Sequence, residues 1–210
     1  MPTATSAPVV APLTRTQYGR ATETLTAAFD ADPLFTWLFP DPTARPLALR
    51  TINRVALDFG LRYGRVTQAG DGQAVAIWVP PGVAVTTGRM LLSGMLGMAF
   101  RVGFRATARF GGANEAMGRI HAAHVPEPHW YLLIVGVSPA TQGGGLGSAL
   151  VADGLAMADA EHQRVYLETS APRNLPFYER LGFRTVEAPT LGNGGPPAWA
   201  MVRGPVVAAR

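Results

Sequence analysis

The chain has 210 residues, of which 48% are hydrophobic and 15% charged, and its formal net charge is +4. One domain with one core fits this length, because chains usually divide only beyond about 250 residues, and the lack of any block of like charges argues against binding nucleic acid. The chain contains no cysteine, and its four histidines include no H-E-x-x-H pair, so we expect neither disulfides nor a bound metal.

The amino-terminal segment lacks the features of a signal peptide. Its first basic residue is Arg15, and three prolines interrupt the residues before it. The most apolar stretch, residues 90–100, lies between Arg89 and Arg101 and falls short of the roughly 20 residues that a spanning helix needs. We therefore expect a cytoplasmic protein that does not bind membranes.

The first part of the chain shows helical periodicity and then a hairpin pattern. We expect a short strand at 8–13, a helix at 17–29, a short aromatic helix within 30–42 and a longer helix at 44–61. The buried stripe of the longer helix should be Leu47, Leu49, Ile52, Val55, Ala56 and Phe59. Residues 64–68 and 74–80 predict two strands joined by a Gly-Asp-Gly turn.

The second part alternates between helices and strands. Helical patterns cover 88–109 and 114–124, and Gly111 and Gly112 predict a break between them. Met90, Met95 and Met98 fall near one face, where they either pack in the core or form a pliable substrate wall. Further on we expect strands at 130–137, 164–169, 183–187 and 198–203, and helices at 146–160 and 174–182, the last closed by Gly182.

A glycine-rich loop, TQGGGLGSALV at 141–151, separates one predicted strand from the next helix. A strand, a glycine loop and a helix in succession form an anion site, because the helix start presents unpaired N–H groups. A P-loop is excluded, since the loop has no lysine. A dinucleotide-binding G-x-G-x-x-G is approached by Gly143, Gly145 and Ser148, with Glu168 as the ribose-binding acid, but that turn normally follows the first strand of its fold.

A third pattern, [QR]-x-x-G-x-[GA], is filled by Gln142, Gly145 and Gly147, and Asn174, Tyr178 and the LGF of 181–183 follow it. With these motifs the chain resembles the GCN5-related N-acetyltransferase (GNAT) family. The resemblance is specific over 130–183, and a fainter similarity to puromycin-type acetyltransferases includes AIWVPPG at 76–82. It implies a single domain over 1–210 of α/β (α+β) class, with a mixed, mostly antiparallel sheet of six to seven strands flanked by helices.

The resemblance also implies acetyl-coenzyme A as co-substrate, with its pyrophosphate on the loop amides and its pantetheine arm beside the preceding strand. The loop residues so implied are Gln142, Gly143, Gly144, Gly145, Leu146, Gly147 and Ser148. A backbone amide near Val135, Gly136 and Val137 would polarise the thioester carbonyl. Gly136 predicts a bulge or a close ligand approach there, or else a simple irregularity of the strand.

Asn174 and Tyr178 lie four residues apart and so share one helix face. In the family, the residue matching Asn174 bonds the coenzyme arm and the one matching Tyr178 directs its hydroxyl at the sulfur. Each has a structural alternative, since Asn174 fits a helix cap and Tyr178 a core aromatic.

For the general base we consider Glu127 and His129, which directly precede the strand beside the coenzyme, although such residues are often merely solvated. Glu168 on the neighbouring strand is a third candidate. An acceptor wall could be formed by Phe35, Trp37 and Trp78, with Asp30 or Asp32 attracting a cation, although aromatic residues of this kind usually pack in the core.

These observations predict an N-acetyltransferase that acts on a primary amine of a small molecule or a peptide in a ternary complex, as a monomer or a homodimer. A non-catalytic acyl-coenzyme A-binding module is the alternative, and retention of Tyr178 favours the enzyme. A dinucleotide-dependent oxidoreductase is the third possibility.

Overall fold

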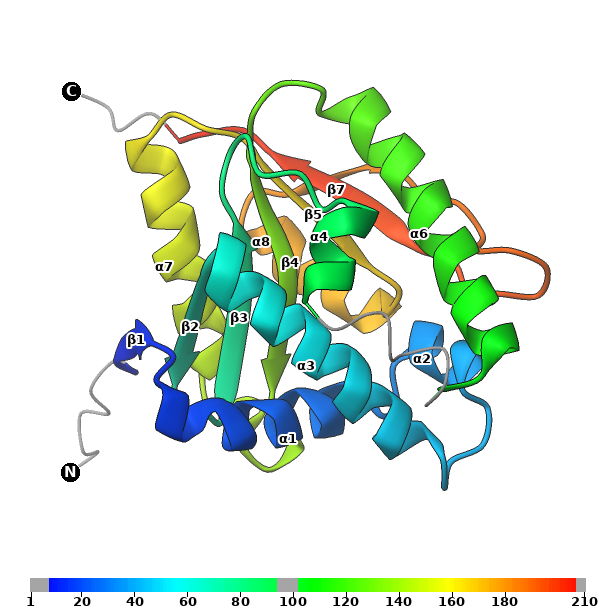
Figure 1. Cartoon of the computed structure of the whole chain (residues 1–210). Coiled ribbons are helices and arrows are strands. Elements are labelled where there is room, and N and C mark those ends of the chain that lie inside the picture. The colour runs from blue at the N-terminus through cyan, green and yellow to red at the C-terminus, as the bar shows by residue number, and fades with distance from the viewer. Residues whose placement is uncertain (1–7, 94–101, 207–210) are drawn as a thin grey trace.

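The structure is a computed structural model that describes residues 8–93 and 102–206. Its strands are β1 (Val10–Pro12), β2 (Arg65–Ala69), β3 (Ala74–Val79), β4 (Trp130–Val137), β5 (Val165–Thr169), β6 (Arg184–Glu187) and β7 (Trp199–Arg203). Its longer helices are α1 (Tyr18–Phe29), α3 (Arg45–Tyr63), α6 (Phe104–His124) and α7 (Leu146–Ala160), and its shorter ones α2 (Pro33–Leu38), α4 (Thr87–Leu92) and α8 (Leu175–Arg180). Figure 1 shows their arrangement.

The described strands form one mixed sheet in the order β1-β2-β3-β4-β5-β7-β6. Every neighbouring pair is antiparallel except β4 and β5, which run parallel. The predicted fold class, a mostly antiparallel sheet of six to seven strands flanked by helices, is confirmed.

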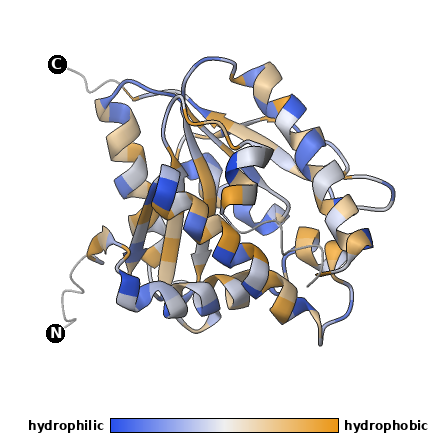
Figure 2. Cartoon of the chain, in the orientation of Figure 1, coloured by the Kyte–Doolittle hydropathy of each residue, from blue (hydrophilic) through white to orange (hydrophobic). Residues whose placement is uncertain are grey.

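Helices cover both faces of this sheet. α1 and α3 contact β3 on one face, and α7 contacts it on the other (Figure 1). The alternation of β3 explains this: Ala74, Ala76 and Trp78 join the cluster under α7, whereas Val75 and Ile77 join the cluster under α1 and α3. Figure 2 accordingly shows mostly hydrophobic central strands between helices that carry both kinds of residue.

Two expectations for the helices are wrong. Leu47 is 56% exposed rather than part of the buried stripe of α3. α6 runs without a break through Gly111 and Gly112, because the helix is held by the packing of Met117 and Ile120 against the sheet rather than by local propensity. That packing offsets the cost of roughly 1 kcal/mol for each glycine.

Two methionines of the predicted stripe, Met95 and Met98, lie outside the described residues. Among the helices that are described, none is long and apolar enough to cross a membrane.

Candidate active site

The parallel strands β4 and β5 separate partway along their length. They pair at Trp130 with Val165, at Tyr131 with Tyr166 and at Leu132 with Leu167, and pairing ends there although both strands continue. The register between β3 and β4 shifts at the same level: Trp78 faces Leu132 and Ile77 faces Ile134, so Leu133 is the extra residue of a β-bulge. The sheet therefore has an opening beside an irregular stretch of backbone.

The sequence suggested a bulge at Gly136, but the structure pairs Gly136 regularly with Val75 of β3. A Cβ on Gly136 would lie 2.7 Å from Cδ2 of Leu25 and 3.2 Å from Cβ of Ala28. Glycine is therefore required because α1 crosses β4 closely at this point, and the bulge lies three residues earlier.

The glycine loop follows the carboxyl end of β4. Gln142 donates from Nε2 to the carbonyl oxygen of Val137 at 3.2 Å, which ties the loop back to the strand. Gly143 and Gly145 have φ of 82° and 81°, a left-handed conformation that favours glycine. A Cβ on Gly147 would lie 3.1 Å from Val137, so the helix start also sits tightly on the strand.

α7 begins at Leu146 with open backbone donors. The N–H of Ala149 donates to the carbonyl oxygen of Gly145 at 2.9 Å, and the three preceding amides lie in the first turn, where a helix offers them no acceptor. A Cβ on Gly143 or Gly145 would meet no atom within 4 Å, so the loop faces open space at these two positions. Loop and helix start therefore form a site for an anion.

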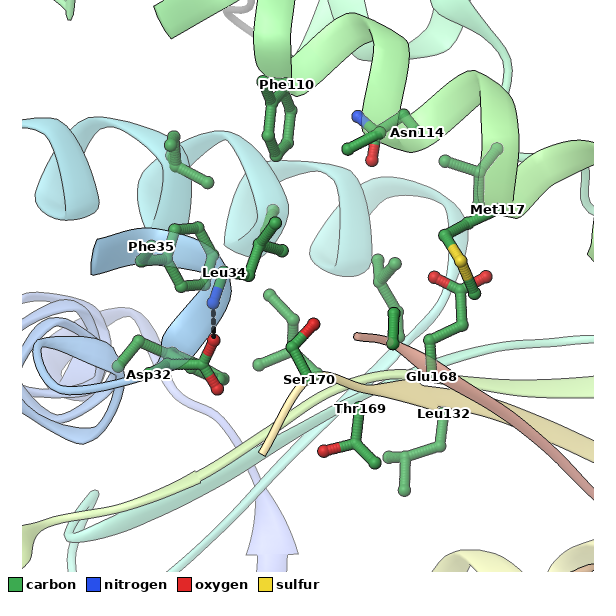
Figure 3. Close-up of a pocket in the computed structure, with 18 of the residues that line it drawn as sticks. Asp32, Leu34, Phe35, Phe110, Asn114, Met117, Leu132, Glu168, Thr169 and Ser170 are labelled. Carbon is green, nitrogen blue, oxygen red and sulfur yellow. Dashed lines mark hydrogen bonds between the residues drawn. The ribbon is translucent and has the colours of Figure 1, made fainter. Parts of the chain in front are cut away.

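A cavity of about 350 Å³ lies where β4 and β5 separate. β4 contributes residues 131–135 to its wall, and β5 and the residue after it contribute Glu168, Thr169 and Ser170. α2, α3 and α6 close the other sides with Phe35, Val55 and Phe110 among others, as Figure 3 shows in part. Asn174 and Tyr178 also line it.

Glu168 is the carboxylate on the strand side of this cavity. The hydroxyl of Tyr166 donates to its Oε1 at 2.9 Å, and the hydroxyl of Tyr131 also bonds it. Burial raises the pKa of Glu168 to about 7, although the two tyrosine hydrogen bonds act in the opposite direction. A carboxyl with this pKa exchanges protons near neutral pH.

Asp32 is the second carboxylate of the cavity, on the side of α2. It caps this helix, since its Oδ1 accepts the N–H of Leu34 at 2.9 Å, and burial raises its pKa. The Tyr178 hydroxyl is buried near Asp32; burial and then the charge of Asp32 raise the tyrosine pKa well above its usual range. Asn174 does not cap α8 with its side chain, because its Nδ2 donates to Oγ1 of Thr169 at 3.2 Å.

The structure does not bring Glu127 and His129 to this cavity. Glu127 pairs with Arg164 at 2.7 Å, and His129 bonds His121 at 2.5 Å between the two Nε2 atoms. Both line a separate hollow of about 280 Å³ at the amino end of β4. They precede the strand in the chain, whereas the cavity opens further along it.

The aromatic residues predicted for the acceptor wall are dispersed. Phe35 lines the cavity, but Trp78 is fully buried under α7, where its ring lies against Gly154, so it cannot meet a substrate. Trp37 lies outside the lining and stacks with the guanidinium of Arg109 at 5.5 Å. The lining also contains Phe29, Phe110 and Met117, which sequence reasoning had not singled out.

Within the described ranges, no group of three His, Asp or Glu side chains is placed to hold a metal ion. The separated parallel strands and the glycine loop at a helix start are the features that the resemblance to coenzyme A-dependent acetyltransferases implies. Comparisons with known proteins identify the class more closely.

A sequence model of the acetyltransferase (GNAT) family matches residues 89–183. An uncharacterized N-acetyltransferase of Schizosaccharomyces pombe is 27% identical over 176 residues, which are 79% of this chain and 70% of that protein. A structure described as histone acetyltransferase HPA2 and related acetyltransferase, from Corynebacterium glutamicum, has a TM-score of 0.69 and 27% identity and covers 97% of this chain and 99% of its own. The ribosomal-protein-S18-alanine N-acetyltransferase of Escherichia coli shares the fold, with a TM-score of 0.55 and 18% identity over 97% of both chains.

The matched residues 89–183 include the glycine loop and Tyr178 and are similar to the GNAT family, and the prediction of an N-acetyltransferase is confirmed. The family implies an acyl-coenzyme A as co-substrate and an amine as acceptor.

Proposed function

We propose that this enzyme transfers an acetyl group from acetyl-coenzyme A to the primary amine of a small molecule or a peptide, by direct attack in a ternary complex. The observation that carries the proposal is the cavity at the separation of β4 and β5, which joins a buried carboxylate, Glu168, to the wall formed by Asn174 and Tyr178. The glycine loop lies at the carboxyl end of the same strand.

The residues of the loop fit the coenzyme. Open N–H groups at the start of α7 suit a pyrophosphate, and Gly143, Gly144, Gly145 and Gly147 keep side chains away from it. Gln142, Leu146 and Ser148 complete the loop. The gap beside Val135, Gly136 and Val137 would take the pantetheine arm, with Asn174 beside it.

The thioester supplies the acetyl group and a thiolate leaving group. The amine nitrogen forms a bond to the carbonyl carbon, the carbon–sulfur bond breaks, and the amine loses one proton. We assign that proton to the carboxylate of Glu168, because its pKa of about 7 leaves about half of it ionised at neutral pH. Backbone amides of the bulge at Leu133 are suited to hydrogen-bond the carbonyl oxygen.

Tyr178 is assigned to the departing sulfur, which leaves as a thiolate and then takes up a proton from solvent, while Glu168 returns the amine proton to solvent. The hydroxyl of Tyr178 has no hydrogen-bond partner in the described part of the chain, and its raised pKa keeps it protonated. It is therefore a hydrogen-bond donor that stabilises the thiolate rather than a strong acid. Glu127 and His129 remain the alternative bases of this proposal, and specificity of the puromycin type stays a prediction.

Thiol release from acetyl-coenzyme A tests the function. Because the chain contains no cysteine, every thiol detected by a colorimetric reagent comes from the coenzyme. We expect thiol release that depends on an added amine. As pH rises through 7, kcat/KM should increase in the wild type and in Glu127→Gln. In Glu168→Gln, kcat/KM should be lower than in the wild type by a factor of at least about 10². Binding of the coenzyme without turnover of any amine would instead support the binding module, and a pH response lost only in Glu127→Gln would move the base to Glu127.

A further inference from the structure

The cavity beside Glu168 has an unusual balance of charge. Asp32 and Glu168 are the only charged side chains among the described residues that line it, and both are acidic. Arg173 influences the pKa of Asp32 but does not line the cavity. A bound anion would therefore lie close to two carboxylates and have no cation to pair with.

The rest of the lining is mainly apolar. Figure 3 shows Phe35 of α2 and Phe110 of α6 toward one end of the cavity, while Met117, from a later turn of α6, lies beside Glu168 at the other end. The uncharged polar side chains of the lining, among them Asn114, Thr169 and Ser170, are outnumbered by the apolar ones. A polar or multiply charged acceptor would lose its hydration here and find few groups to replace it.

Asp32 is already engaged as a helix cap through Leu34. Its charge repels anions, but one of its oxygens is not free to pair with an ammonium group. The volume of about 350 Å³ is at the lower end for ligand sites, about 300 to 1,000 Å³. The wall at Asn174 and Tyr178 is assigned to the coenzyme, so the acceptor has only part of this volume. The small space favours a compact acceptor over a long peptide or a large polycation.

We propose that the acceptor is a small monoamine with an apolar body, an arylalkylamine or a branched alkylamine, that carries no anionic group. The inference rests on the proposed function, since it places the amino group at Glu168. The apolar body would then lie against Phe35 and Phe110, across the cavity from the carboxylate.

Three amines that differ in one feature each provide the test: 2-phenylethylamine, phenylalanine, which has the same body with a carboxylate, and ethylamine, which lacks the body. Thiol release should give 2-phenylethylamine a kcat/KM at least about tenfold above that of either of the others, since one methylene in an apolar pocket is worth about 10-fold or more. Spermidine and an alanine-initiated peptide extend the set to polycations and peptides, and both should be poorer acceptors.

A pair of variants on α6 locates the apolar body. Phe110→Ala should reduce the ratio of kcat/KM for 2-phenylethylamine to that for ethylamine by about tenfold. Phe104→Ala is the matched control, because Phe104 is 75% exposed and does not line the cavity, so this ratio should not change. A ratio within one variant does not depend on how much of the protein is folded.

The outcomes separate this inference from the proposed function. Faster turnover of phenylalanine, spermidine or the peptide than of 2-phenylethylamine would overturn the inference and leave the N-acetyltransferase proposal in place. Coenzyme binding without thiol release from any of these amines would overturn both. An unchanged ratio in Phe110→Ala would refute the placement of the apolar body.

Discussion

Replacing Glu168 by glutamine should make the protein more stable while it impairs catalysis. In the folded chain burial raises the pKa of Glu168 from 4.5 to about 7. Between these two values the folded state holds a proton that the unfolded chain has released. The free energy of unfolding therefore falls as pH rises through this interval. A carboxylate held by an ion pair has the opposite effect.

The size of the effect follows from the interval. At about 1.4 kcal/mol for each pH unit, ionising Glu168 in the folded state costs at most about 3 kcal/mol once the pH exceeds 7. Glutamine keeps an oxygen that can accept the hydroxyl of Tyr166 but carries no charge. Relative to wild type, Glu168→Gln should thus gain about 1 kcal/mol at pH 5 and about 3 kcal/mol at pH 8.

Urea unfolding at these two pH values, followed by circular dichroism, measures this gain. At pH 8 the melting temperature should also rise, by roughly 6 to 12 °C for a chain of this length. Glu127→Gln is the control, because Glu127 pairs with Arg164 at the surface and should show no such pH-dependent gain. An equal change in stability at pH 5 and pH 8 in Glu168→Gln would refute the reasoning that the buried carboxyl titrates near neutrality.

Three further substitutions test the other parts of the site. Tyr178→Phe should lower kcat by about 10² and leave coenzyme affinity unchanged in calorimetry; a wild-type kcat with a lower melting temperature would make Tyr178 a packing residue. Gly145→Val should abolish coenzyme binding. Gly82→Val is the control, because Gly82 has a similar φ of 79° but follows β3, at the end of the sheet opposite to the glycine loop, so this variant should still bind the coenzyme. Equal losses of binding would indicate that backbone strain alone is responsible. Gly154→Ala places a methyl group against the ring of Trp78 and should cost about 1–3 kcal/mol in urea unfolding with an unchanged KM for the acceptor; the reverse result would return Trp78 to the acceptor wall.

Features encoded by neighbouring residues could be predicted from the sequence. The strand at 130–137 and the helix at 146–160 have the predicted bounds, because an apolar run, a glycine loop and a regular helical pattern follow one another directly. The prediction of a helix break at Gly111 and Gly112 was wrong, because this feature is not encoded by neighbouring residues. The stability of α6 depends on residues far away in the chain, and local propensity does not contain them.

The same distinction explains the predictions for the site. The loop at 142–148 is continuous in sequence and was found through its spacing. The cavity draws its walls from α2, α3, α6 and two strands, so no single stretch of sequence reveals it. Trp78 was selected for its residue type, and Glu127 and His129 for their closeness along the chain, and neither criterion reports closeness in space.

The position of Glu168 depends on the register between two strands. Leu132 and Leu167 are the last paired residues of β4 and β5, so Glu168 is the first residue of β5 beyond the pairing. Side chains alternate along a strand, so Tyr166 and Glu168 share one face, and there the tyrosine hydroxyl reaches the carboxylate at 2.9 Å. A shift of one residue in this register would turn Glu168 toward the apolar cluster under α7 and Leu167 toward the cavity. The core therefore fixes the candidate base, because the burial of Leu167 is what directs Glu168 to the site.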